Sequence, residues 1–113
     1  MKVELYVSPS CSHKDQARAI VDEAIAESSQ AADVEVISIG EYEDAKAKRF
    51  FGSPTVRVNG MDVEYGDREP EEFATSCRFY NSPDGWRPLP SKGLVLRGIE
   101  TALRRQQAAQ KSQ

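Results

Sequence analysis

The sequence is poor in the residues that mark disulfide-rich, zinc-binding, nucleic-acid-binding or membrane proteins. It has two cysteines, one histidine and one tryptophan in 113 residues, and the cysteines do not form a C-x-x-C pair. Two cysteines are too few for a disulfide scaffold. A formal net charge of −3 offers no basic face for nucleic acid. No apolar run approaches the ~20 residues of a membrane span. We therefore expect neither nucleic acid nor a membrane as partner.

Length and the N-terminal residues indicate one small domain. The first residues, MKVELYVSPSCS, lack an apolar stretch followed by a small-residue cleavage site. We therefore expect a cytoplasmic protein, in which a permanent disulfide would be unusual. The chain length fits one domain, which we assign to residues 1–105, with a polar C-terminal tail at residues 106–113. We expect a monomer.

Four segments have the composition of β-strands. Residues 2–7 alternate, with Val3, Leu5 and Val7 on one face. Residues 33–39 and 55–58 form two further apolar runs. Asn59-Gly60 is a strong signal for a tight hairpin turn. After that turn, a fourth strand is predicted to return over residues 61–65, and it is the last strand that we predict.

Three segments are predicted to be helices. The first follows Ser8-Pro9-Ser10, and the second covers residues 41–51 and ends at Gly52. The third begins near Ser91. The core-facing stripe of the first helix has helical spacing and comprises Ala17, Ile20, Val21, Ala24 and Ile25. Turn residues dominate residues 66–90, which we predict to be an irregular loop insert. The order β-α-β-α-β-β-α predicts an α/β fold, a four-stranded mixed sheet flanked by helices on both faces.

Two segments carry a resemblance to a known family. They are YVSPSCSHK at residues 6–14 and GSPTVRVNG at residues 52–60. With the order of elements, a cysteine after the first strand and a proline opening the third resemble the thioredoxin-like superfamily, with glutaredoxins and small thioredoxins nearest in size. The resemblance implies sheet order 2-1-3-4, with the third strand antiparallel to its neighbours. It also implies a cis bond before Pro54 and a substrate-binding edge at Ser53, Pro54 and Thr55.

The resemblance places Cys11 at the start of the first helix, as a reactive thiol. Helix N–H groups and the cations Lys14 and protonated His13 would favour its thiolate. The family's usual second cysteine, three positions on, is Lys14 here, so the site is of monothiol type. The implied function is thiol–disulfide redox chemistry on a protein or small-molecule disulfide, with Cys11 as nucleophile. Cys77, or an external thiol such as glutathione acting as co-substrate, would resolve the mixed disulfide.

Several alternatives remain open at this point. Cys11 and Cys77 could each be a small packed residue, and His13 a solvent-exposed one. Strand directions return the chain to the Cys11 pole near Tyr65, which allows Cys77 to reach it without requiring this. The two cysteines, with or without His13, could instead bind a soft metal, an organomercurial or an iron–sulfur cluster. They make too few ligands for a structural zinc site, and no cofactor is expected. A redox-silent domain that binds a partner through residues 66–90 is the other alternative, so enzymatic activity stays open.

Overall fold

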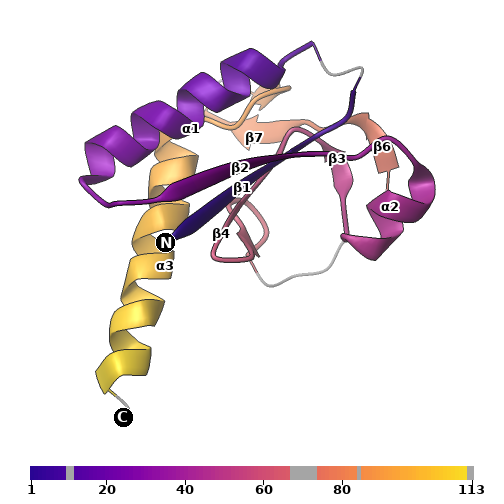
Figure 1. Cartoon of the computed structure of the whole chain (residues 1–113). Coiled ribbons are helices and arrows are strands. Elements are labelled where there is room, and N and C mark those ends of the chain that lie inside the picture. Colours follow the sequence, from indigo (N-terminus) through magenta and orange to yellow (C-terminus); the bar gives the residue numbers. More distant parts are fainter. Residues whose placement is uncertain (10–11, 67–73, 84, 112–113) are drawn as a thin grey trace.

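Four strands form the central mixed sheet of the computed structural model (Figure 1). The structure describes residues 1–9, 12–66, 74–83 and 85–111, with the backbone alone at residues 42, 51, 74–77, 110 and 111. The sheet order is β2-β1-β4-β5, and its strands are β1 (Lys2–Val7), β2 (Asp33–Ser38), β4 (Thr55–Val58) and β5 (Met61–Asp62). β1 is parallel to β2, whereas β4 is antiparallel to both β1 and β5. The predicted order and strand directions are confirmed.

In the described part of the chain, three helices cover the two faces of this sheet, as predicted. They are α1 (Lys14–Ser28), α2 (Tyr42–Ala47) and α3 (Lys92–Lys111). Because side chains alternate along a strand, Val3, Leu5 and Val7 of β1 share the face that packs against α1 and α3. On the opposite face, Tyr6 packs in a smaller cluster with Ile39, Ala45 and Phe50. The core therefore lies mainly between the sheet and the α1–α3 pair.

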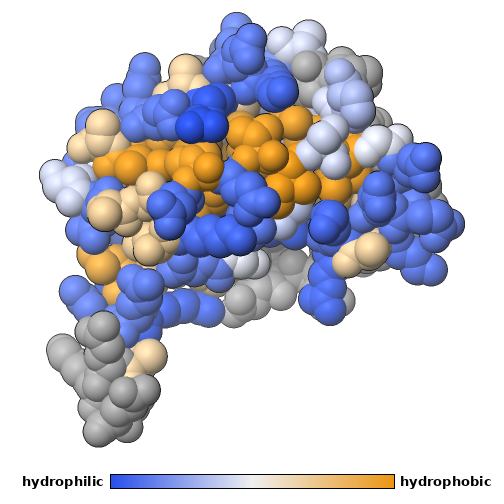
Figure 2. Space-filling view, viewed as in Figure 1, coloured by the Kyte–Doolittle hydropathy of each residue, from blue (hydrophilic) through white to orange (hydrophobic). Residues whose placement is uncertain are grey.

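β2 is an edge strand that pairs with β1. Figure 2 shows hydrophobic side chains gathered in a band along this edge, bordered by polar side chains on both long sides. Val34 and Val36 of β2 are half-buried and pack against the main core. Within the described residues, no helix is long and apolar enough to cross a membrane.

Several predicted boundaries are wrong. The tail expected at residues 106–113 is helical to Lys111, because its Arg, Gln, Ala and Lys residues are good helix formers. α2 ends at Ala47, and the expected continuation turns into β3 (Phe51–Ser53) after the buried Phe50. The strand expected over residues 61–65 ends at Asp62. There the carboxylate accepts the N–H groups of Glu64 and Tyr65 and turns the chain.

The prediction of an irregular loop over residues 66–90 is also wrong for the part that the structure describes. This region contains β6 (Ala74–Cys77), β7 (Tyr80–Ser82) and β8 (Gly85–Arg87). β6 pairs in parallel with β3, and β7 and β8 form an antiparallel hairpin. Residues 67–73 and 84 lie outside the described residues. Figure 1 shows β6 beside β3, next to the end of the sheet where β1 finishes. The region thus adds two small sheets at that end.

Candidate functional site

Cys11 lies outside the described residues, and Cys77 is described by its backbone alone. The residues around these two positions define the candidate site. The surrounding parts are the end of β1, the segment around Pro54, β6 and the start of α1.

The Ser53–Pro54 peptide bond is cis, and the segment around it is held by hydrogen bonds from three directions. The Ser8 N–H, just beyond β1, donates to Ser53 Oγ at 3.0 Å. The Arg78 N–H donates to the Ser53 carbonyl at 2.9 Å. The Tyr80 hydroxyl donates to the Pro54 carbonyl. These bonds fasten the segment to the end of β1 on one side and to the residues after β6 on the other.

The residues expected to bind substrate are buried. Ser53 is 1% exposed and Thr55 is 0% exposed, and Pro54 is among the fully buried side chains. The Thr55 hydroxyl donates to the Gly52 carbonyl at 2.6 Å. Contact between these three residues and a substrate therefore stays a prediction, and in this conformation they form the interior of the site.

β6 places the backbone of Cys77 beside the cis-proline. In the parallel β3–β6 pair, Cys77 stands opposite Ser53. Ser53 in turn accepts the hydrogen bond from Ser8, which precedes Cys11 by three residues. Sequence analysis left the position of Cys77 open, because the chain between Tyr65 and Cys77 could have carried it elsewhere. The backbone of Cys77 lies at the same pole of the sheet as the end of β1.

A buried charge cluster that sequence analysis missed lies next to Cys77. The guanidinium of Arg78, a residue only 4% exposed, donates to both carboxylate oxygens of Asp62 at 2.7 and 2.9 Å. It also donates to Glu64 at 3.3 Å and lies over the Tyr80 ring, 4.2 Å from its centroid. The only sequence signal was a lone arginine between Cys77 and an aromatic pair, which is too weak to predict burial. The cluster anchors the segment after β6 to the β4–β5 hairpin.

Burial and pairing shift the pKa values of this cluster in opposite senses. Burial alone would raise the pKa of Asp62, but the hydrogen bonds and charge of Arg78 outweigh it and lower that pKa. Burial raises the pKa of Tyr80 well above its ordinary value of about 10. Asp62 is therefore ionised and Tyr80 is a neutral hydroxyl donor at pH 7. This matches the hydrogen bond from Tyr80 to Pro54.

Comparison with known proteins places the chain in a family. No family model matches it, and no solved structure matches it significantly. The thioredoxin of Methanocaldococcus jannaschii is 36% identical over 66 residues, which make up 58% of this chain and 76% of that protein. The chain belongs to the thioredoxin family. The resemblance seen in the sequence is thereby confirmed, and thiol–disulfide redox chemistry is the general function that membership indicates.

The start of α1 carries the two residues expected to activate the thiolate in this thioredoxin-family chain. His13 is half-buried and occupies the N-cap position, and its carbonyl accepts the Ala17 N–H at 2.9 Å. Lys14 opens α1 and is exposed. The two residues follow Cys11 by two and three positions in the sequence, and their effect on its thiol stays a prediction.

His13 lines a hollow of about 450 Å³ between α1 and the β7–β8 hairpin. We call this hollow the hairpin pocket. Besides two prolines, its lining consists of His13, Gln16, Ser82, Arg87, Leu89 and Ser91. The hairpin pocket therefore borders the start of α1, close in the sequence to the predicted nucleophile Cys11.

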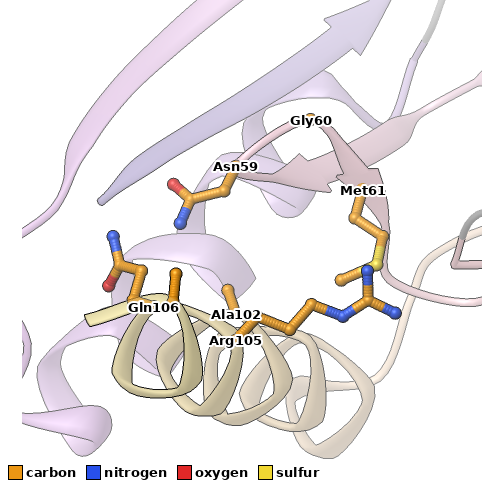
Figure 3. A pocket seen from close by; sticks show the side chains of 7 residues that line it. Asn59, Gly60, Met61, Ala102, Arg105 and Gln106 are labelled. Carbon is orange, nitrogen blue, oxygen red and sulfur yellow. The ribbon is translucent and has the colours of Figure 1, made fainter. Parts of the chain in front are cut away.

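A second hollow lies at the other end of β4. Figure 3 shows Asn59, Gly60 and Met61 of the β4–β5 turn facing Ala102, Arg105 and Gln106 of α3. Its volume is about 310 Å³. Pro54 and the turn occupy opposite ends of β4, so this hollow is remote from the cis-proline and takes no part in the site.

Sequence analysis left open a soft-metal site formed by Cys11 and Cys77, with or without His13. Among the described side chains, no three His, Cys, Asp or Glu residues gather in a way that could hold a metal ion. The thiols of Cys11 and Cys77 lie outside that set. The soft-metal alternative therefore stays a prediction.

Proposed function

We propose that this thioredoxin-family chain is a thiol–disulfide redox protein in which Cys11 is the nucleophile and Cys77 resolves the mixed disulfide. The observation that carries the proposal is the pairing of β6 with β3, which sets the Cys77 backbone opposite Ser53. Family membership supports thiol–disulfide exchange as the reaction, and the β3–β6 pairing supports Cys77 as the resolving cysteine. A reducing compartment such as the cytoplasm would keep both thiols reduced between turnovers.

Chain geometry supports a meeting of the two sulfurs. Neighbouring strands generally lie about 4.8 Å apart, and Cys77 stands opposite Ser53 in the β3–β6 pair. Ser53 Oγ is bonded to the Ser8 N–H, and the three residues from Ser8 to Cys11 reach at most about 11 Å. A disulfide needs Cα atoms roughly 4.4–6.8 Å apart. The connected chain can meet this requirement without dismantling the sheet.

The reaction balances over two exchange steps. The Cys11 thiolate attacks one sulfur of the substrate disulfide, which forms a Cys11–substrate disulfide and releases the first substrate thiolate. The Cys77 thiolate then attacks the Cys11 sulfur, which forms the Cys11–Cys77 disulfide and releases the second. Two electrons pass from the protein thiols to the substrate, and the two thiol protons go to the released thiolates. Two molecules of an external thiol such as glutathione, a co-substrate, would reduce the protein again.

Mass spectrometry of the oxidised protein tests this assignment. Stoichiometric oxidation of the full chain should give an intramolecular bridge, seen as a mass loss of about two hydrogens. Cys77→Ser should abolish that loss and trap the mixed disulfide at Cys11, while Cys11→Ser should abolish disulfide reduction altogether. Turnover that survives Cys11→Ser would contradict the nucleophile, and an undiminished turnover rate in Cys77→Ser would contradict the resolving role.

Alkylation kinetics test the activation of Cys11. Native Cys77→Ser protein should react with iodoacetamide at pH 7 faster than a free cysteine of pKa about 8.5. Lys14→Ala should slow the reaction, because it removes a cation from the first turn of α1. Lys46→Ala, which removes an exposed lysine from α2, is the matched control and should leave the rate unchanged. Equal rates in the two variants would refute the role of Lys14.

A further inference from the structure

We propose that the hairpin pocket binds the substrate, and that the substrate is a small disulfide carrying carboxylates rather than an extended polypeptide. This inference rests on the proposed function, since it names the substrate class for the thiol chemistry at Cys11. It depends on three observations: the closed state of the cis-proline segment, the position of the hairpin pocket, and the charge of its lining.

The carbonyls of Ser53 and Pro54 already accept hydrogen bonds from the chain itself. The Ser53 carbonyl accepts the Arg78 N–H, and the Pro54 carbonyl accepts the Tyr80 hydroxyl. β6 already occupies the edge of β3 as a parallel partner. An extended substrate could add to this segment only after displacing β6, and with it the buried cluster of Arg78. The chain itself therefore fills the position where a strand-like substrate would pair.

The hairpin pocket is joined to this segment by Tyr80. Tyr80 opens β7, and its hydroxyl fixes the base of the hairpin to the Pro54 carbonyl. Ser82 and Arg87, further along the hairpin, line the pocket together with His13. His13 follows Cys11 by two residues in the chain. A ligand in the pocket would thus be held by groups tied both to the cis-proline and to the start of α1.

The size of the pocket suits a small molecule. Ligand sites in proteins commonly measure about 300–1,000 Å³, and the hairpin pocket measures about 450 Å³. Leu89 and two prolines add apolar groups to the lining, which can cover the methylene groups beside a disulfide. Such a volume accommodates a disulfide of a few dozen atoms at most.

The charge of the lining selects carboxylates. Two basic side chains, His13 and Arg87, line the pocket, and its described lining includes no carboxylate. Asp84, in the turn of the hairpin, lies outside the described residues. Arg87 is exposed, and its planar fork matches a carboxylate with two parallel hydrogen bonds. The hydroxyl of Ser91 accepts the Leu94 N–H and keeps its own proton to donate. The chain carries a net charge of −3, so this basic lining stands against the overall charge.

A series of disulfides of nearly equal size and different charge tests the proposal. The probes are 3,3′-dithiodipropionate, which is anionic, 2-hydroxyethyl disulfide, which is neutral, and cystamine, which is cationic. The full chain should reduce them with kcat/KM falling in that order, and it should reduce the protein disulfides of insulin more slowly than dithiodipropionate. Arg87→Gln should lower kcat/KM for dithiodipropionate about tenfold, through KM, because one charge-assisted contact is lost. Its effect on cystamine should be absent or opposite.

Arg104→Gln is the matched control, because Arg104 is an exposed arginine on α3 outside the pocket lining. A second readout needs no turnover: Trp86, the single tryptophan, precedes Arg87 in β8. Dithiodipropionate should change the fluorescence of Trp86 in Cys11→Ser protein. Arg87→Gln should raise the probe concentration needed for half of this change about tenfold.

Each outcome separates this inference from the proposed function. Turnover without charge preference, an unchanged KM in Arg87→Gln, or faster reduction of insulin would overturn the substrate class while leaving Cys11 as nucleophile. Absence of turnover with every disulfide would overturn the proposed function, and the substrate assignment with it. A Trp86 response that is equal for all three probes would likewise overturn the charge selection by the hairpin pocket.

Discussion

Replacing Arg78 by methionine should destabilise the fold more than any surface substitution. Arg78→Met keeps most of the side-chain volume but removes the charge that faces Asp62. Asp62 is 7% exposed, and its carboxylate would keep two hydrogen bonds, from the N–H groups of Glu64 and Tyr65. Both of these reach the same oxygen, so the other loses its donor. Breaking one partner of a buried ion pair costs about 3–5 kcal/mol.

That loss is large against the total stability of a small domain, about 5–15 kcal/mol. Urea unfolding, followed by far-UV circular dichroism and extrapolated linearly to water, measures it. The surface pair of Arg18 with Asp22, one helical turn apart on α1, is the matched control. Because both side chains of that pair are about half exposed, Arg18→Met should cost less than about 0.5 kcal/mol.

A double-mutant cycle isolates the interaction itself. Asp62→Asn keeps the oxygen that accepts the two backbone N–H groups and removes the negative charge. The double variant with Arg78→Met should therefore lose about 1–3 kcal/mol less than the sum of the single variants. Strict additivity, or an Arg78→Met cost no larger than that of Arg18→Met, would refute the assignment of Arg78 as a buried, paired charge.

Three further predictions concern the same end of the molecule. Because Arg78 lowers the pKa of Asp62 in the folded state, this carboxylate stabilises the fold above about pH 4 and loses its contribution as the pH falls further. The urea midpoint of Asp62→Asn should therefore drop less between pH 5 and pH 2.5 than that of the unmodified chain, and equal drops would contradict the shift. Because burial raises the pKa of Tyr80, Tyr80→Phe should leave the 295 nm tyrosinate titration unchanged between pH 9 and 11 while costing about 1–3 kcal/mol of unfolding free energy. Gly52→Ala should cost about 2–5 kcal/mol, since φ is +137° and a Cβ would lie 2.6 Å from the Arg78 Cβ. Gly60 has a φ of +84° but open space around it. Gly60→Ala should therefore lower the free energy of unfolding, measured by urea denaturation, by only about 1 kcal/mol.

The central sheet could be predicted because its signals are local. Val3, Leu5 and Val7 alternate over a whole strand, and Asn59-Gly60 specifies the turn between two others. A helix between β1 and β2 then requires them to be parallel. The cis bond before Pro54 was implied by a short motif together with this topology, and the structure has that isomer.

The region after Tyr65 could not be predicted because its stabilising contacts are distant in the sequence. β7 and β8 have three residues each, which is too few for an alternating pattern of apolar and polar residues to be recognised. Arg78 finds its main partner Asp62 sixteen residues away. No propensity or period encodes such a pair. The activating roles of His13 and Lys14 and the thiols of Cys11 and Cys77 stay predictions for the same reason, since they depend on three-dimensional placement at single residues.

The charge cluster and the cysteine are coupled through strand register. The Arg78 N–H binds the Ser53 carbonyl, and the Arg78 side chain binds Asp62. A slip of one residue between β3 and β6 would turn the side chain of Arg78, the residue that follows β6, to the opposite side. It would leave the carboxylate of Asp62 buried without its cation. The cost of about 3–5 kcal/mol for such a charge suppresses the slipped register at least a hundredfold. Cys77, directly before Arg78, is therefore held opposite Ser53 by an electrostatic contact that does not involve its own side chain.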